Sequence, residues 1–289
     1  MSIVSGSQSA NAVAEDALSV DSFNAVLRQR AADYAELCRP RIAVMTMISV
    51  AVGFTLASPI SFQATTLLLA LCGIVLLVAA SSILNQCLER PTDRLMTRTM
   101  QRPIASGRLP VAEAVTVASA ITAIGFWMLW TAVNPDTAIA TLATLLTYVL
   151  GYTVLKTKTS FCTTVGAVPG AMPPVLGWLA AGGHWGYEAL ALFGVFFVWQ
   201  FPHFLAIGWI HRKDYEQAGL RMLPSFKDNG LLTGLIAVAY AAAFVPISAM
   251  PTQVGMSGDL YLCVALAVSV SYLIYSIRFL MVRTDERAR

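Results

Sequence analysis

Long apolar stretches, separated by short polar connections, run through most of the chain. A helix needs about 20 mostly apolar residues to cross a bilayer, and a window of about 19 residues detects such stretches. The sequence contains eight of them, at approximately 42–58, 64–84, 112–132, 137–155, 162–181, 188–209, 231–250 and 259–281. The pattern therefore predicts an all-α polytopic membrane protein, built as a bundle of about eight transmembrane helices.

The composition agrees with this prediction. Of the 289 residues, 57% are hydrophobic and only 12% are charged, which is too apolar for a soluble domain. We expect the lipid bilayer as the environment of the chain and no nucleic acid as a partner. The five cysteines are scattered without metal-ligand spacing, so the sequence indicates neither a disulfide framework nor a zinc site.

The N-terminal segment differs from the rest of the chain. Residues 1–33 are rich in Ser, Ala, Asn and Asp and have no long apolar core, so they resemble neither a cleaved secretory signal nor a membrane span. We predict a mobile tail at residues 1–33 and a transmembrane domain at residues 34–289.

The positive charges all fall on one side of the predicted bundle. Lys and Arg are retained in cytoplasmic loops, so their distribution gives the orientation. The loops on the other side carry only acids, namely Asp136, Glu188 and Asp259. We therefore predict a multi-pass protein of the bacterial inner membrane with both termini in the cytoplasm. The cationic residues are Arg28, Arg30, Arg39, Arg41, Arg90, Arg94, Arg98, Arg102, Arg108, Lys156, Lys158, Arg212, Lys213, Arg221, Lys227, Arg278, Arg283, Arg287 and Arg289.

Three oxygen-bearing side chains follow the second span at intervals of four. Asn85, Glu89 and Asp93 would share one face of a helix, and converging carboxylates repel each other unless a cation lies between them. Mg²⁺ fits best, because it is usually held by one or two carboxylates together with substrate phosphates. Pro91 removes one backbone hydrogen bond, so we expect the helix to kink or end there. The alternative is an interfacial ion-pair network with Arg90, Arg94 and Arg98.

Other polar residues lie on the same side of the membrane. Asp214, just past the sixth span, is the natural fourth carboxylate of a metal site. His203 lies inside the sixth span, four residues after Trp199 and therefore on the same helical face, either as a ligand or as a partner of a polar neighbour. Five cations could bind phosphate oxygens, although topology alone also explains them: Arg98, Arg102, Lys156, Arg212 and Lys213.

The predicted fifth span is dense in Gly and Pro. Small residues at Gly166 and Gly170 favour close helix packing, whereas Pro169, Pro173 and Pro174 suit a kinked helix beside a cavity. We favour packing as the interpretation.

Taken together, these motifs resemble the protoheme IX farnesyltransferases, or heme O synthases, of the UbiA-type intramembrane prenyltransferases. The resemblance extends over residues 34–281 or so, and the two polar motifs are highly specific in combination. They read Asn85-x3-Glu89-x3-Asp93-x2-Met96-x-Arg98-Thr99-x2-Arg102-Pro103 and Trp199-Gln-Phe-Pro-His203-Phe, the latter followed by Arg212-Lys213-Asp214-Tyr215-x3-Gly219-x2-Met222-Leu-Pro224. Supporting matches are Arg39-Pro40-Arg41 and Gly151-Tyr152-Thr-x2-Lys156.

The resemblance implies transfer of a farnesyl group from farnesyl diphosphate to a vinyl group of heme b, with addition of water. It implies that Asn85, Glu89, Asp93 and Asp214 hold Mg²⁺ on the diphosphate and that His203 contacts heme. The five cations named above would stabilise the leaving group. Tyr148 and Tyr152 could stabilise an allylic cation through their rings, although tyrosine is more often an interfacial aromatic. Heme A synthase or a second copy of the chain is a possible partner.

Two departures and two alternatives accompany this resemblance. The superfamily commonly has nine spans, one more than predicted here, and Pro91 stands where an acidic or polar residue is usual.

A transferase for an aromatic quinone precursor usually carries two aspartates four apart in the second motif, but here Ala218 follows Asp214 at that spacing. A secondary transporter would place its ionisable residues near the bilayer midplane rather than at one face.

Overall fold

The computed structural model describes residues 23–57, 62–221, 223, 230–282 and 284, and no strand occurs among them. Residues 23–37 are helical. The further elements are α2 (Pro40–Ala57), α3 (Ala64–Asp93), α4 (Pro103–Ser106), α5 (Val111–Ala132), α6 (Pro135–Leu146), the π-helix η1 (Thr147–Tyr152), α7 (Thr153–Leu155), α8 (Cys162–Ala180), α9 (Tyr187–Ile210), α10 (Arg212–Gln217), α11 (Leu231–Ser248), α12 (Met250–Gln253) and α13 (Asp259–Val282).

The predicted all-α membrane fold is confirmed. Within the described residues, seven helical segments are long and apolar enough to cross a membrane: α2, α3, α5, Pro135–Leu155, α9, Leu231–Gln253 and α13. The remaining predicted span is α8, a helix of 19 residues that contains three prolines. Because α8 packs against α2, α6 and α9, protein rather than lipid covers much of it, and its surface needs less apolar character.

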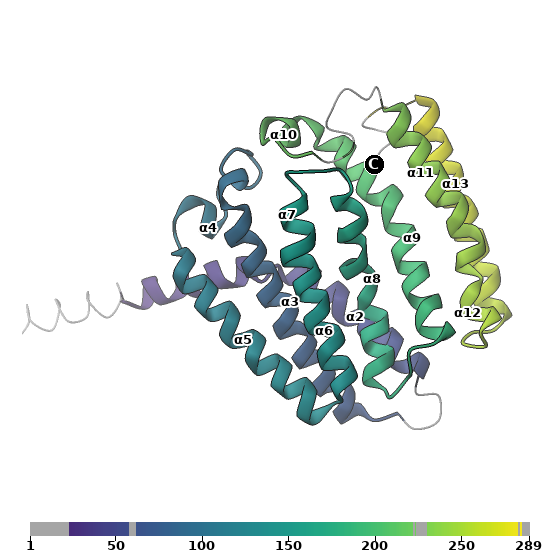
Figure 1. Ribbon diagram of the computed structural model, residues 1–289, viewed down its shortest axis with the longest axis horizontal. Coiled ribbons are helices and arrows are strands. Elements are labelled where there is room, and N and C mark those ends of the chain that lie inside the picture. Colours follow the sequence, from purple (N-terminus) through teal and green to yellow (C-terminus); the bar gives the residue numbers. More distant parts are fainter. Residues whose placement is uncertain (1–22, 58–61, 222, 224–229, 283, 285–289) are drawn as a thin grey trace, which may run out of the picture.

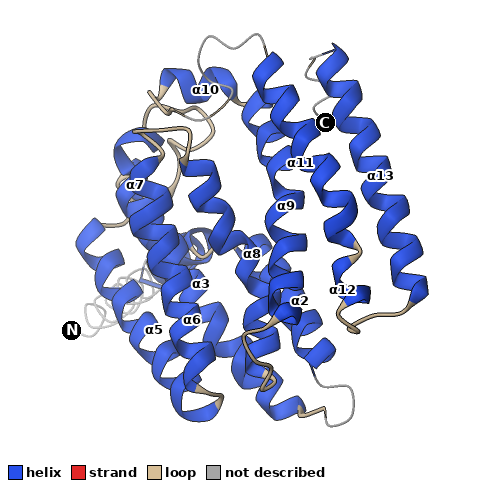
Figure 2. Ribbon diagram, turned by 45° about the vertical axis from the view of Figure 1, so that its right-hand side comes forward, coloured by secondary structure: helices blue, strands red, loops and turns tan. Residues whose placement is uncertain are grey.

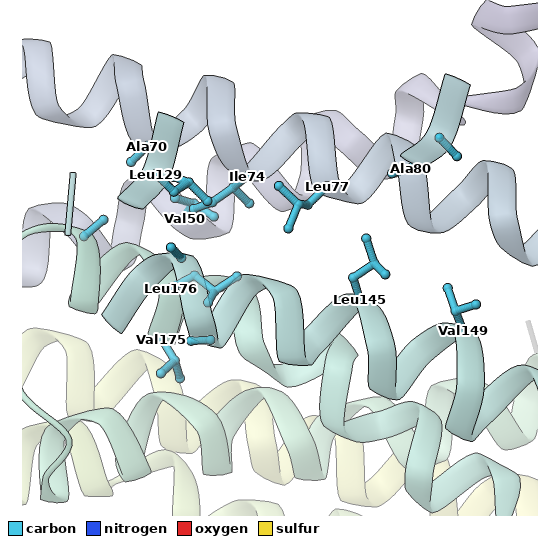
Figure 3. Close-up of a cluster of buried hydrophobic side chains, with 14 of the residues drawn as sticks. Val50, Ala70, Ile74, Leu77, Ala80, Leu129, Leu145, Val149, Val175 and Leu176 are labelled. Carbon is cyan, nitrogen blue, oxygen red and sulfur yellow. The ribbon is translucent and has the colours of Figure 1, made fainter. Parts of the chain in front are cut away.

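The helices pack in a chain of neighbours around α8 (Figures 1 and 2). On one side, α8 contacts α2 and η1, while α3 packs along α5. On the other side, α8 contacts α9, which contacts α11, which in turn contacts α13. The main core lies between α2, α3, α5, α6, η1 and α8, where Val50, Ile74, Leu77, Leu145 and Leu176 are buried (Figure 3).

Glycines allow α8 to approach its neighbours closely. A Cβ atom on Gly177 would lie 1.9 Å from the carbonyl oxygen of Val50 in α2, and one on Gly53 would lie 1.9 Å from the carbonyl oxygen of Pro174. Gly166 faces the ring of Tyr152, and a Cβ on Gly170 would lie 2.3 Å from Oε1 of Gln200 in α9. The packing interpretation of these glycines is confirmed.

Helix α3 is longer than the span predicted at 64–84, since it has 30 residues and ends at Asp93. It includes Pro91, so the helix does not end at the proline but two residues beyond it. Asn85, Glu89 and Asp93 therefore lie on one helix. In Figure 1, α4, α7 and α10 lie at the same end of the bundle, and α12 lies at the opposite end.

The N-terminal helix, residues 23–37, is joined to the body of the protein by polar contacts. Arg30 and the Tyr34 hydroxyl both donate to Glu113 at the start of α5. Arg108 pairs with Asp33 at 3.4 Å. The predicted boundary between tail and domain, after residue 33, falls inside this helix. Residues 1–22 of the predicted tail lie outside the described residues, as do Met222, Pro224, Lys227, Arg283, Arg287 and Arg289.

Candidate active site

The acidic motif occupies the last turns of α3 and points into the protein. Asn85 is 1% exposed, Glu89 7% and Asp93 1%. Burying carboxylates is costly unless charged or hydrogen-bonding partners compensate them, and at the end of a membrane helix such residues indicate function. The partners come from two other parts of the chain.

Each carboxylate has one dominant cationic partner. The Lys156 ammonium lies 3.0 Å from Oε1 of Glu89. One guanidinium nitrogen of Arg102 donates to both carboxylate oxygens of Asp93, at 2.9 and 2.8 Å, and lies 3.9 Å from Glu89. Burial opposes the charge of Lys156, but Tyr152 and Glu89 raise its pKa above the ordinary value, so the ammonium is protonated at neutral pH. The cluster thus holds two acids and two cations in mutual contact.

The π-helix η1 brings two aromatic rings to this cluster. The rings of Tyr148 and Tyr152 are stacked with centroids 5.4 Å apart, and the Lys156 ammonium lies 5.7 Å from the Tyr152 centroid. Thr153, the next residue, accepts a hydrogen bond of 2.9 Å from the Asn85 side chain. Single π-helical turns occur often at functional sites.

The second polar motif packs over the first without joining the acidic cluster. Met96 from the first loop forms a buried hydrophobic cluster with Tyr215, Ala218 and Leu220. The backbone N–H of Arg221 donates to the Lys156 carbonyl at 3.1 Å. These contacts fix the segment around α10 beside the cluster.

Asp214 is directed elsewhere within this segment. Its carboxylate is about 30% exposed and lies 3.9 Å from Nδ1 of His211. Burial and the positive charge of Arg98 lower the pKa of His211, which places Arg98 near the same segment. No group of three or more His, Cys, Asp or Glu side chains arranged for a metal occurs in the part of the chain that the structure describes. Asp214 therefore does not form a ready-made triad with Glu89 and Asp93.

The remaining predicted residues lie apart from the acidic cluster. Arg212 stacks on the Trp209 ring with its guanidinium carbon 4.4 Å from the centroid, and Lys213 is exposed. His203 lies within α9 as predicted, but its side chain is exposed and stacks beside Trp199 with centroids 5.5 Å apart. The structure thus gathers Asn85, Glu89, Asp93, Arg102, Lys156 and Tyr152, and does not gather Arg98, His203, Arg212, Lys213 and Asp214 with them.

Sequence reasoning missed three residues of the site. Thr153 holds the Asn85 amide, and the Thr99 hydroxyl donates to the Asp93 carbonyl at 2.9 Å. Arg39, whose backbone is left-handed at φ 48°, acts on Glu89 through its charge. All three stand in the quoted motifs: Thr99 in the first polar motif, Thr153 directly after Tyr152, and Arg39 in the Arg-Pro-Arg match. The sequence pattern assigned none of them a role.

The donor set of the cluster suits a hard divalent cation. Glu89, Asp93 and the Asn85 amide offer oxygen atoms only, and two carboxylates with room for phosphate oxygens are the usual protein contribution to a Mg²⁺ site. The neighbouring Lys156 and Arg102 suit the remaining oxygens of a diphosphate. The cluster can therefore bind a metal together with a phosphorylated ligand.

Comparison with known proteins decides the family. A family model described as the UbiA prenyltransferase family matches residues 46–289. The chain belongs to this family. Its curated relatives include the protoheme IX farnesyltransferase of Solibacter usitatus, 39% identical over 266 residues that span 89% of this chain and 91% of the relative. The protoheme IX farnesyltransferase of Marinobacter nauticus is 38% identical over 257 residues, or 88% and 84% of the two chains.

Solved structures show the same fold. A digeranylgeranylglyceryl phosphate synthase matches with a TM-score of 0.75 and 17% identity, over 90% of this chain and 91% of the other. A UbiA homolog from Archaeoglobus fulgidus bound to DMAPP and Mg²⁺ matches with a TM-score of 0.69 and 19% identity, over 86% of each chain. This UbiA family member is a prenyltransferase and a multi-pass integral membrane protein, and the resemblance drawn from its motifs is confirmed.

Proposed function

We propose that this prenyltransferase moves a farnesyl group from farnesyl diphosphate to a vinyl group of heme b, giving heme O and diphosphate. The observation that carries the proposal is the buried cluster in which Glu89 and Asp93 face Lys156 and Arg102. The protoheme IX farnesyltransferases among its relatives support the choice of donor and acceptor.

The reaction begins with cleavage of the allylic C–O bond of farnesyl diphosphate. The bonding electrons leave with the diphosphate oxygen, and the guanidinium of Arg102 and the ammonium of Lys156 stabilise the charge that develops there. Mg²⁺ held by Asn85, Glu89 and Asp93 would neutralise further charge on the diphosphate as a Lewis acid. The stacked rings of Tyr148 and Tyr152 present their negative faces to the allylic cation.

The vinyl group of heme b then supplies the electron pair for the new C–C bond. The resulting cation next to the porphyrin ring takes up water and loses a proton, which gives the hydroxyl group of heme O. Around the reacting atoms, the apolar bundle keeps water away from the allylic cation until this bond has formed.

The predicted residues outside the acidic cluster have further roles in the proposed reaction. Asp214 would complete the metal site from the segment around α10, and Arg98, Arg212 and Lys213 would contact diphosphate oxygens. His203 would contact heme, since its imidazole is exposed on α9 and available to a planar ligand. Replacing His203 by Ala should then change the absorption spectrum of bound heme.

The cellular setting follows from the charges. Retention of Lys and Arg on the cytoplasmic side supports an inner-membrane protein with both termini and the acidic cluster at the cytoplasmic face. A phosphatase reporter fused after Gly183, in the connection between α8 and α9, should then be active outside the cytoplasm. The product would serve terminal oxidases, with heme A synthase or a second copy of the chain as partner.

The test is prenyl transfer by the purified protein in detergent or nanodiscs. Heme b, farnesyl diphosphate and Mg²⁺ should yield a farnesylated hydroxyethyl heme, resolved by liquid chromatography and mass spectrometry. Asp93→Asn should reduce the rate at least about a hundredfold, because the variant loses a carboxylate that would hold Mg²⁺ on the diphosphate, and with it stabilisation of the charge that develops there. Prenylation of 4-hydroxybenzoate with heme b left unchanged would instead assign the protein to aromatic quinone precursors.

A further inference from the structure

The Thr153 hydroxyl links the π-helix to the acidic motif on α3. Its Oγ1 lies 3.0 Å from the carbonyl oxygen of Tyr148 and 2.9 Å from Nδ2 of Asn85. Both Thr153 and Asn85 are buried, at 6% and 1% exposure, so water does not compete for these groups. Replacing Thr153 by a residue without a hydroxyl group would therefore leave Asn85 without this partner.

The chemistry of the three groups fixes the orientation of the Asn85 amide. A carbonyl oxygen accepts and never donates, so Thr153 must spend its single hydroxyl proton on Tyr148. The hydroxyl can then only accept from Asn85, and the branch of the amide that faces it must be the NH₂ group. The amide is planar, so its oxygen lies on the opposite branch.

The π-helix is what makes this arrangement possible. Other threonine hydroxyls in the same bundle, such as that of Thr141, donate to the carbonyl four residues earlier, Thr137 in that case. Thr153 instead reaches the carbonyl five residues earlier, that of Tyr148, at the end of the wide turn Thr147–Tyr152. The wide turn places the hydroxyl opposite Asn85.

We propose that Thr153 is a positioning residue that holds the Asn85 amide with its oxygen available to a metal ion. Groups behind a metal ligand fix its orientation, and losing them typically weakens metal binding by about 10- to 100-fold. The proposal rests on the proposed function, since it assumes that Asn85 binds the metal that accompanies the prenyl diphosphate.

The experiment measures metal binding directly. Purified protein is titrated with Mn²⁺ in the presence of farnesyl thiodiphosphate, an unreactive analogue, and free Mn²⁺ is followed by electron paramagnetic resonance. Thr153→Val has nearly the same shape but cannot accept a hydrogen bond, so its affinity for Mn²⁺ should fall about tenfold. Thr153→Ser keeps the hydroxyl and should bind like wild type.

Thr141→Val is the matched control, because it also removes a buried hydroxyl from a helix of this region. It should bind Mn²⁺ like wild type. If Thr153→Val does not elute as a monodisperse species, Thr153→Ala replaces it in the same titration. Equal affinity of wild type and the folded Thr153 variant would overturn the positioning role alone, whereas absence of Mn²⁺ binding by wild type would overturn the proposed function as well.

Discussion

Each carboxylate of the candidate site is held by a cation that has a second use. Lys156 neutralises Glu89, and Arg102 neutralises Asp93. A buried ion pair contributes little net stability, because desolvation offsets much of the attraction. The two ion pairs are thus better explained by ligand binding than by stability. A diphosphate would pair with Lys156 and Arg102, and a divalent cation would pair with Glu89 and Asp93.

Lys156→Met tests whether Lys156 both compensates the buried charge of Glu89 and acts on the substrate. The variant leaves Glu89 buried without its cation, so the free energy of unfolding should fall by about 3 kcal/mol or more. Adding Glu89→Gln should restore much of the thermal stability in detergent but not the transferase activity, since both groups act on the substrate. Lys158→Met, at an exposed position two residues on, serves as the control. A double variant as unstable as the single one would contradict the argument.

The sequence predicted that Asn85, Glu89 and Asp93 lie on one helix, as they do in α3, but it predicted their surroundings only in part. Asn85, Glu89 and Asp93 were found because spacing by four is a helical property that survives any tertiary arrangement. Thr153 and Thr99 were assigned no role, since their hydrogen bonds depend on the tertiary arrangement. Thr153 meets Asn85 of another helix, and Thr99 bonds to Asp93 within the connection that follows α3. Asp214 was grouped with the acids by its membrane depth and by the resemblance, and neither determines the direction of a side chain.

Among the helices, α8 makes the closest backbone contacts described above, at its crossing with α2. The crossing of α2 and α8 has two glycine contacts, in which Gly53 and Gly177 each face a backbone carbonyl of the other helix. Backbone cannot move aside as a side chain does, so this crossing tolerates no added atom.

Gly177→Ala should destabilise the protein. The new methyl group would lie 1.9 Å from the Val50 carbonyl oxygen and force the helices apart. Overpacking typically costs about 1–3 kcal/mol, which should appear as a lower midpoint of thermal unfolding in detergent. Gly258→Ala is the control, because a Cβ there meets nothing within 4 Å. A midpoint equal to that of the control would show that the crossing can relax.

The elements themselves were predicted with errors that have physical causes. Hydropathy windows detect only the apolar part of a helix. The predicted span therefore ended at residue 84, before Asn85, although α3 continues to Asp93. The π-helix is a single wide turn within a longer helix, so it leaves no periodic signal in the sequence. The helix at residues 23–37 is held by Glu113 and Arg108, which lie far away in sequence.

At the scale of the whole molecule, the acidic cluster lies at one end of a bundle whose helices expose many large apolar side chains. Figure 2 shows α10 at this end and α12 at the other. In the proposed reaction, the diphosphate would lie at this end, while the farnesyl chain and the porphyrin ring would remain in apolar surroundings. This division suits a reaction between a charged leaving group and two hydrophobic substrates.

The most direct test of the account is the transfer reaction run in water enriched in ¹⁸O. With heme b, farnesyl diphosphate and Mg²⁺, wild-type protein should form a heme that carries one farnesyl group and one ¹⁸O atom, as measured by mass spectrometry. Recovery of only unmodified heme b after incubation with folded protein, or of a farnesylated heme without oxygen from water, would contradict the account.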